Sequence, residues 1–548
     1  MLHGLMMRVP LLISALIEYA DLNHGDAEIV SRRIEGDIHR YTYRDLHRRA
    51  RQLANALDRL GIRTSDRVAT LAWNGYRHME LYFAVSGAGA ILHTVNPRLH
   101  PDQMAWIINH AEDRVLFFDL SFLPLVEAIA PRCRSIEHYV LMIDKDRMPP
   151  TSKVADLACY EDLVNNNSDH YTWPELDEEL ASSLCYTSGT TGNPKGVLYS
   201  HRSIILHTYA GCLPDSFNIS GRDTILPVVP LFHVNAWGFP YGAAMTGARM
   251  VFPGAQLDGK SLYELFESER VTFSAGVPTV WQGLLAHTEA QKLTFSTMRR
   301  TCIGGSACPP AMITLFQEKY GVQVLHAWGM TETSPMGSVC TLKDKHRLAS
   351  PAERLAVQRK QGRAPFGIEL KIAGADGGDL PRDGHAFGDL LVRGPWVARE
   401  YFRGEGGNPL SVDDRRRGWF PTGDVATIDP DGYMQITDRS KDVIKSGGEW
   451  ISSIDIENIA MSHPAVAMAA CIAVKHPKWD ERPLLVVVKK RDVEVTREAI
   501  LAHYQGKVAS WQVPDDVVFV ESIPVGATGK MLKTKLREML HDYKLPST

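Results

Sequence analysis

Apolar residues along this chain follow two patterns that alternate, one with a helical period and one in short continuous runs. Tyr43–Leu60 has the spacing of an amphipathic helix, and the apolar run Arg67–Ala72 follows it as a predicted buried strand. Further predicted strands, each preceded by a helix-like segment, include Ile91–Val95, Val115–Phe118 and Val324–His326. Strands that alternate with helices over hundreds of residues are typical of mostly parallel sheets. The pattern therefore predicts an α/β fold.

The pattern changes after about residue 360, where glycine and proline become more frequent and strands follow one another through turns, as in Gly388–Gly394 and Asp429–Ile436. A polar run, Thr437–Val443, then precedes about a hundred residues of mixed strand and helix character. We expect a large N-terminal domain and a small, mobile α+β C-terminal domain. The predicted parts are residues 1–437 (with a β-rich subdomain at about 360–437), a hinge at 438–443, and residues 444–548.

Composition narrows the class of protein. The 548 residues include 60 Lys and Arg against 64 Asp and Glu, and 44% are hydrophobic. These values are those of a globular protein, and they argue against a nucleic-acid binder that works through a basic face. The eight cysteines form no CxxC pair, which argues against a zinc site or a disulfide framework and favours the cytoplasm. No apolar run is long enough to predict a transmembrane helix.

Residues 186–196, Tyr-Thr-Ser-Gly-Thr-Thr-Gly-Asn-Pro-Lys-Gly, concentrate hydroxyl groups, glycines and one lysine. Glycines let a backbone turn tightly and direct its N–H groups at an anion, hydroxyls add donors, and Lys195 adds a positive charge. The segment therefore indicates a polyphosphate cradle, although a solvated Ser/Thr/Gly loop has the same composition. Pro194 stands where a Walker A loop has its second glycine, so a P-loop NTPase is not indicated.

Five segments in order resemble the motifs of the adenylate-forming superfamily, which includes acyl-CoA synthetases, luciferases and peptide-synthetase adenylation domains. They are residues 186–196, 327–333, 418–424, 438–448 and 524–533. The resemblance implies that a carboxylic acid and ATP form an acyl-adenylate and pyrophosphate, and that the thiol of CoA then takes the acyl group. A luciferase-like oxidase and a non-catalytic nucleotide-binding protein remain alternatives, although the latter would be expected to lose Lys530 or Glu332, and both are present.

The resemblance also implies roles for the matched residues in the first step. Lys530 and Lys195 would offset the repulsion between the carboxylate and the phosphates, Thr331 would contact the α-phosphate, and Glu332 would bind Mg²⁺ with Thr187. The implied cofactor-binding residues are Thr187, Ser188, Gly189, Thr190, Thr191, Gly192, Trp328, Gly329, Asp424, Arg439, Gly447 and Gly448. Taken alone, Asp424 would also fit a turn, and Trp328 would also fit ordinary core packing.

In the family, the C-terminal domain rotates between the two steps. Lys441 matches the hinge residue of this rotation, and Lys445 would face the adenylate in the second step. Gly447 and Gly448 would then line the channel for the pantetheine arm of CoA, where close backbone approach suits glycine.

Pro230–Gly238 resembles the acyl-pocket segment of the family. It lacks the acidic residue with which amino-acid-activating relatives hold an amine, so an amino acid substrate is disfavoured. Trp237 matches a tryptophan that gates the tunnel of long-chain fatty acyl-CoA synthetases, and glycines at nearby positions would leave space for an acid larger than acetate. The expected pocket residues are His233, Trp237, Gly304, Gly305 and Gly329.

Two branches of the family resemble the whole chain. Leu11–Ser14 and Ile38–Tyr43 are similar to 3-methylmercaptopropionate-CoA ligases, whereas His93–Arg98 and Lys445–Ser453 are similar to bacterial fatty acyl-CoA synthetases. The first resemblance makes 3-methylmercaptopropionate the expected acid, with a medium- or long-chain fatty acid as the alternative. ATP, Mg²⁺ and CoA are the implied cofactors, and a homodimer is implied because relatives often form one.

Overall fold

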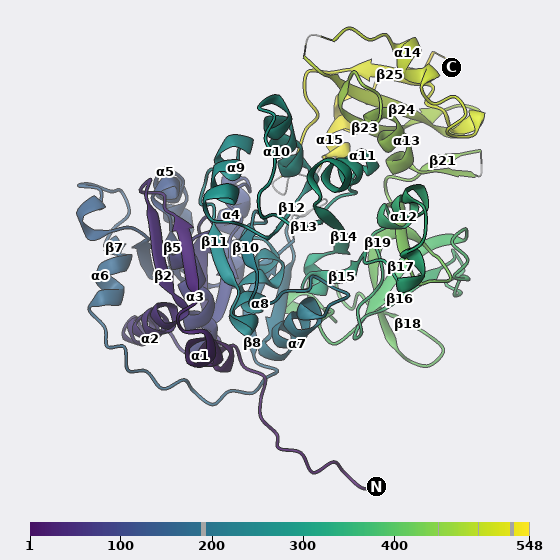
Figure 1. The fold of residues 1–548 in the computed structure, drawn as a ribbon. Helices are drawn as coiled ribbons and strands as arrows, with labels where there is room; N and C mark the ends of the chain where they lie inside the picture. The colour runs from purple at the N-terminus through teal and green to yellow at the C-terminus, as the bar shows by residue number, and fades with distance from the viewer. Residues whose placement is uncertain (188–192, 448, 492, 527–530, 547–548) are drawn as a thin grey trace.

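The computed structural model describes residues 1–187, 193–447, 449–491, 493–526 and 531–546. Two large sheets form its N-terminal part (Figure 1). The strands of the first, in spatial order, are β15 (Met336–Val339), β14 (Gln323–Gly329), β13 (Arg300–Ile303), β12 (Phe273–Gly276), β10 (Thr224–Pro227), β11 (Arg249–Phe252), β1 (Glu28–Arg32) and β2 (Ile38–Thr42). Those of the second are β7 (Ala158–Cys159), β6 (His138–Leu141), β5 (Asp113–Phe118), β3 (Arg67–Leu71), β4 (Ile91–Thr94), β8 (Ala181–Tyr186) and β9 (Gly196–Ser200).

Both large sheets are parallel except at their edges, where β1 pairs with β2, β14 with β15, and β8 with β9 in antiparallel register. The helices of this part are α1 (Ile13–His24), α2 (Tyr43–Arg59), α3 (Tyr76–Gly87), α4 (Pro101–Ala111), α5 (Leu123–Ile129), α6 (Tyr160–Asn165), α7 (His201–Cys212), α8 (Phe239–Thr246), α9 (Gly259–Ser268), α10 (Pro278–Ala290), α11 (Pro310–Thr314) and α12 (Pro351–Gln358). No helix in the described part of the chain has both the length and the apolar character that a membrane span needs.

The helix α2 shows how the sequence pattern sets this architecture. Thr42 caps its first turn in a reciprocal pair with Asp45, and Leu46, Leu53 and Leu57 are buried along one face. Each such buried side chain stabilises the fold by about 1.5–3 kcal/mol. The predicted helix over this range is therefore confirmed, with an end that differs by one residue.

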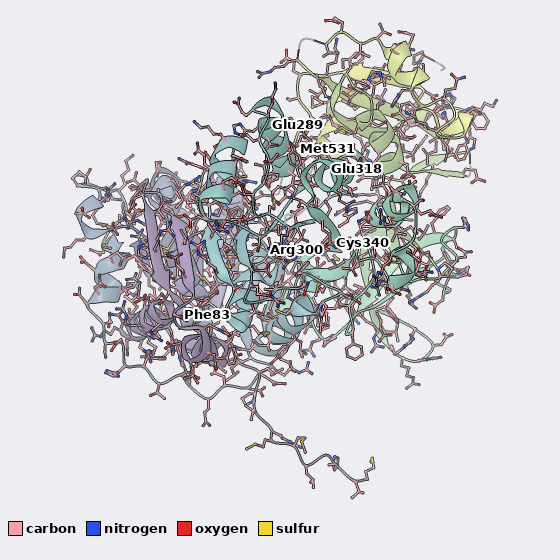
Figure 2. The ribbon with its side chains drawn as sticks, in the orientation of Figure 1. Phe83, Glu289, Arg300, Glu318, Cys340 and Met531 are labelled. Carbon is pink, nitrogen blue, oxygen red and sulfur yellow. The ribbon has the colours of Figure 1, made fainter. Side chains whose placement is uncertain are left out.

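One large hydrophobic cluster joins the two parallel sheets. It contains Val68 and Leu92 from the second sheet and Ile225 and Phe273 from the first. Side chains fill the space between the ribbons, and Phe83 of α3 lies inside this core (Figure 2). Because the cluster spans both sheets, the loops at their strand ends are held at fixed positions relative to one another.

Two smaller sheets follow. The strands of the first are antiparallel: β16 (Glu369–Ala373), β17 (Phe387–Arg393), β19 (Gly418–Ile428), β18 (Ser411–Val412) and β20 (Met434–Arg439), with the predicted hairpin turn between β19 and β20. The C-terminal sheet contains β22 (Glu449–Ile451), β21 (Ile444–Ser446), β24 (Asp480–Lys489), β23 (Val466–His476) and β25 (Asp516–Phe519), with α13 (Ser453–Met461), α14 (Arg497–Ala502) and α15 (Lys533–Met539). The predicted α/β class, with a large N-terminal and a small C-terminal domain, is confirmed (Figure 1).

Candidate active site

The predicted phosphate loop is the connection between β8 and β9. The Thr187 backbone N–H donates to the Lys195 carbonyl oxygen at 2.8 Å, and the Lys195 N–H donates to the Thr187 hydroxyl at 3.1 Å. These two bonds hold the ends of the loop together, so the backbones of Lys195 and Thr187 are neighbours. The predicted binding residues Ser188, Gly189, Thr190, Thr191 and Gly192 lie outside the described residues.

Tyr401 joins two of the predicted catalytic residues. Its hydroxyl donates to Glu332 Oε1 at 2.6 Å, and the Lys195 Nζ lies 4.7 Å from the centroid of its ring. Burial and the Glu332 carboxylate raise the pKa of Tyr401, so the hydroxyl keeps its proton and acts as a donor. The ring therefore holds a cation on its face while its hydroxyl orients a carboxylate.

Two other parts of the chain, β9 and the segment just before Tyr401, fix the backbone around Glu332. The Ala398 N–H donates to the Glu332 carbonyl oxygen at 2.8 Å, and the Tyr199 hydroxyl donates to the Thr331 carbonyl oxygen at 2.6 Å. Thr331 and Glu332 are only 8% and 6% exposed. Sequence reasoning missed Tyr401, because it lies in an aperiodic polar stretch, 69 residues from its carboxylate partner.

Trp328, Asp424 and Arg439 form a second group. The Trp328 indole N–H donates to Asp424 Oδ2 at 2.8 Å, and Arg439 Nε lies 3.4 Å from Asp424 Oδ1. Asp424 and Arg439 are also opposite one another in the register of β19 and β20. Trp328 and Asp424 are buried, whereas the Arg439 side chain is 44% exposed. The structure thus brings together the residues expected to bind adenine and ribose.

The segment before α8 has an unusual backbone. Val234, Asn235, Ala236 and Trp237 all have φ between 46° and 56°, and Gly238 has φ 80°. For residues other than glycine, this left-handed region costs about 1–2 kcal/mol per residue. Such strain persists only where surrounding contacts hold it.

The left-handed turn places Trp237 beside Gly304, as expected for a common pocket wall. A Cβ at Gly304 would lie 3.2 Å from the Trp237 ring and 3.0 Å from the Ala327 carbonyl oxygen. Gly305 has φ 80°, a conformation that favours glycine. His233 lines a small cavity together with Thr187 and Phe232, so this predicted pocket residue lies next to the base of the phosphate loop.

The expectation that Gly329 leaves space for the acid is wrong. A Cβ at this position would lie 1.8 Å from the Pro335 carbonyl oxygen. The space is occupied by backbone, because the chain folds back on itself where β14 pairs with β15. Glycine is required here for close backbone approach and does not open the pocket.

Three predicted residues of the second step lie further along the chain. Lys445 belongs to β21, and its backbone N–H donates to Glu481 at 2.8 Å. Gly447 has φ 61°, and a Cβ there would lie 2.8 Å from the Trp479 ring. Lys441 is exposed between β20 and β21. Gly448 and Lys530 lie outside the described residues.

Ionic contacts that the sequence did not predict tie α15 to α13 and to Asp442. Lys533 Nζ lies 2.7 Å from Glu457 Oε1, and Arg537 is paired with Asp442 at 2.7 Å. Burial alone would lower the pKa of Lys533, but the Glu457 and Asp438 carboxylates raise it, so the ammonium stays charged. Asp438 in turn accepts from the Ser453 N–H at 2.6 Å.

Comparison with known proteins identifies the class. The AMP-binding enzyme family matches residues 17–402, and the C-terminal domain of AMP-binding enzymes matches residues 455–530. This chain belongs to the AMP-binding enzyme family, and within it to the AMP-forming acyl-CoA ligases, which use ATP and CoA.

Three relatives show how closely the chain follows this class. It is 52% identical to a 3-methylmercaptopropionyl-CoA ligase of Ruegeria lacuscaerulensis, over 98% of this chain and 99% of the relative. It is 51% identical to a medium-chain-fatty-acid–CoA ligase of Ectopseudomonas oleovorans, over 100% and 99%. The anthranilate CoA ligase AuaEII, solved with anthranoyl-AMP, superposes with a TM-score of 0.86 at 25% identity, over 98% and 99%.

Proposed function

We propose that this acyl-CoA ligase activates 3-methylmercaptopropionate. The observation that carries the proposal is the apolar wall formed by Trp237 against Gly304, next to a segment without acidic residues. A methylthio group is apolar and polarizable, so such a wall suits it. The 52% identity to a ligase of that name supports the same acid. A medium- or long-chain fatty acid is the second candidate, because the 51% identical relative carries that name and the same wall suits an alkyl chain.

In the first half-reaction, a carboxylate oxygen of the acid would attack the α-phosphorus of ATP. The bond to the β-phosphate breaks, and pyrophosphate leaves. The approach of two anions is the main obstacle, so fixed positive charge at Lys195 and at Lys530 would lower the barrier. Asp424 would accept hydrogen bonds from the ribose, since its two oxygens have lone pairs beyond those engaged by Trp328 and Arg439.

The family resemblance assigns Mg²⁺ to Glu332 and Thr187, which would hold it together with the phosphates. Mg²⁺ in phosphoryl-transfer sites usually binds one or two carboxylates together with substrate phosphates and water. A single buried carboxylate that is oriented by Tyr401 fits this donor set. When bound, the ion would neutralise charge on the phosphates.

In the second half-reaction, the CoA thiolate would attack the acyl carbonyl carbon, and the bond to AMP would break. We propose that residues 438–443 act as the hinge that exchanges Lys530 for Lys445 and Gly447 at the site, with residues 444–548 moving as one domain. The contacts of Asp438 and Asp442 with Ser453 and Arg537 support a hinge that is coupled to this domain.

A homodimer in the cytoplasm completes the proposal. All eight cysteines are free thiols, as expected in a reducing compartment. Light scattering on purified protein tests the dimer, and a mass of 61.0 kDa in solution would contradict it.

The substrate is tested by comparing kcat/KM for 3-methylmercaptopropionate, octanoate, palmitate and acetate, with ATP, Mg²⁺ and CoA. We expect 3-methylmercaptopropionate to exceed acetate by about tenfold or more, because each buried methylene or similar group contributes a factor of about 10–200. Higher values for octanoate or palmitate would support the second candidate. If no acid drives CoA-dependent AMP formation, the proposed function is wrong.

Tyr401 offers a test of the adenylation site that separates its two contacts. Tyr401→Phe keeps the ring beneath Lys195 but removes the hydroxyl from Glu332, whereas Tyr401→Leu removes both. We expect Phe to weaken the Mg²⁺ dependence of ATP binding about threefold to tenfold, and Leu to lower adenylation further. Calorimetric titration of ATP at several Mg²⁺ concentrations measures the first effect. Equal behaviour of the two variants would contradict separate roles.

A further inference from the structure

The left-handed turn of residues 234–237 has one polar side chain that anchors it. Asn235 is 2% exposed, and its Nδ2 donates to the Ser183 hydroxyl at 2.9 Å. Its Oδ1 accepts from the Cys185 thiol at 3.5 Å. The Tyr82 hydroxyl oxygen also lies 3.5 Å from Oδ1. The turn is therefore attached to β8 of the second sheet and to α3.

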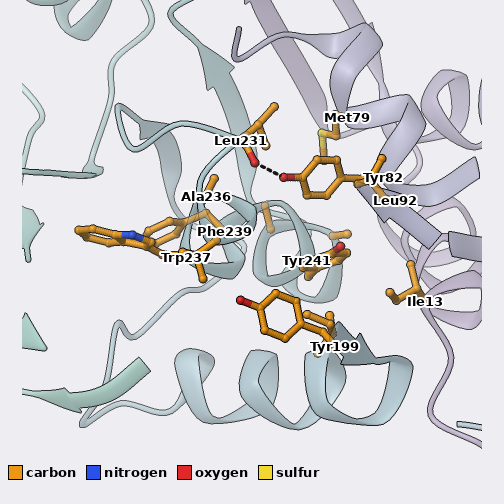
Figure 3. Packing of buried hydrophobic residues seen from close by; sticks show 14 of the residues in the cluster. Ile13, Met79, Tyr82, Leu92, Tyr199, Leu231, Ala236, Trp237, Phe239 and Tyr241 are labelled. Atoms are coloured by element: carbon orange, nitrogen blue, oxygen red, sulfur yellow. Dashed lines mark hydrogen bonds between the residues drawn. The ribbon is translucent and has the colours of Figure 1, made fainter. Parts of the chain in front are cut away.

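The contacts on either side confine the same turn. Before it, the Tyr82 hydroxyl donates its single proton to the Leu231 carbonyl oxygen, the dashed line in Figure 3. After it, a Cβ at Gly238 would lie 2.8 Å from the His207 ring of α7. In Figure 3, Trp237 projects away from Tyr82 and Tyr241, on the other side of the turn. Contacts before, within and after the turn thus confine its strained backbone.

We propose that Asn235 is a positioning residue that sets the acid selectivity of this ligase by holding Trp237 against Gly304. This inference rests on the proposed function, because it assumes that Trp237 and Gly304 wall the acyl pocket. The side-chain hydrogen bonds of Asn235 go to β8 and not to Trp237, so its effect passes through the backbone of residues 235–237.

The physical reason is the cost of the left-handed backbone. Asparagine tolerates this region better than most residues, but Val234, Ala236 and Trp237 do not. Without the bonds from Asn235, the free energy of the protein would fall if these residues returned to right-handed or extended backbone. The Cα–Cβ direction of Trp237 would then change, and its ring would leave Gly304. The position of the pocket wall is thus maintained by the hydrogen bond of Asn235 to the second sheet, and not by the apolar packing of Trp237 alone.

The variant Asn235→Gly tests the anchor, because glycine accepts positive φ but forms no side-chain bond. We expect the ratio of kcat/KM for octanoate to that for 3-methylmercaptopropionate to change about tenfold, with the KM for ATP within about twofold of the parent. The matched control is Asn218→Gly, the same substitution at an exposed asparagine with φ 55° that lies outside this turn. We expect it to keep the parent ratio.

A second readout does not depend on catalysis. Acrylamide quenching of tryptophan fluorescence is compared between each background and the same background carrying Trp237→Phe, so that the difference reports Trp237. Trp237 is 8% exposed, and we expect it to be shielded in the parent and in Asn218→Gly. In Asn235→Gly we expect it to become accessible to the quencher. An unchanged selectivity ratio with unchanged quenching would overturn the proposal.

Ser183→Ala covers the case in which Asn235→Gly fails to fold. It removes only the acceptor of the 2.9 Å bond, and we expect a smaller shift of both readouts in the same direction. No shift in a folded Ser183→Ala protein would count against the anchor. If the parent activates none of the acids, the proposed function fails, whereas the quenching difference still decides whether Asn235 holds Trp237.

Discussion

Replacing Lys530 by alanine is expected to lower the rate of acyl-adenylate formation by about 10²–10³, the usual loss when a fixed donor to developing charge is removed. Thioester formation from preformed acyl-AMP and CoA should stay within about tenfold of the parent, because Lys445 and not Lys530 is proposed to face the adenylate in that step. Pyrophosphate release measures the first half-reaction, and CoA-dependent AMP release from synthetic acyl-AMP measures the second.

Lys535→Ala is the matched control for this experiment, because it removes the same charge from an exposed position in α15. Lys533 would be unsuitable, since it is paired with Glu457. An equal loss in both half-reactions of Lys530→Ala would contradict the proposed exchange of the two lysines.

Asp424→Ala is expected to raise the dissociation constant of ATP about tenfold to a hundredfold. The substitution removes the acceptor of the buried Trp328 N–H, which lowers the free energy of unfolding by about 1–3 kcal/mol and frees the indole beside the proposed nucleotide site. It also removes the charge opposite Arg439 and the proposed ribose acceptor. Asp424→Asn keeps an acceptor for Trp328 but loses the charge, so it should lie between the parent and the alanine variant.

Calorimetric ATP binding and thermal unfolding measure these effects together. Asp431→Asn serves as the control, because Asp431 lies in the turn of the same β19–β20 hairpin and pairs with Lys345. It should leave ATP binding unchanged. If Asp424→Asn binds ATP as the parent does, the carboxylate charge has no part in nucleotide binding.

Local signals explain what the sequence could predict. The apolar spacing of Tyr43–Leu60 and the Asp431-Gly432 turn involve residues close together in the chain, so α2 and the β19–β20 hairpin could be predicted. The phosphate loop, Trp328, Asp424 and Arg439 could be named because they match motifs of a known family. Their mutual contacts could not, because Trp328 and Asp424 are 96 residues apart.

The residues that the sequence did not predict, and the one whose role it predicted wrongly, have the same physical origin. Tyr401 and Asn235 have no local pattern, since each acts through partners that only the fold brings near. Gly329 was misjudged because a glycine in a motif can either leave space or permit close backbone approach, and only the position of the Pro335 carbonyl oxygen distinguishes the two.

The end of β20 has a consequence for how the two half-reactions communicate. Successive side chains of a strand point to opposite faces, and Asp438 and Arg439 are successive. Arg439 faces Asp424, whereas Asp438 accepts from Ser453 at the start of α13. One peptide unit therefore separates the proposed nucleotide-binding side, at Asp424, from the contact with α13 of the C-terminal domain. An insertion or deletion of a single residue here would exchange the two faces and disconnect both partners at once.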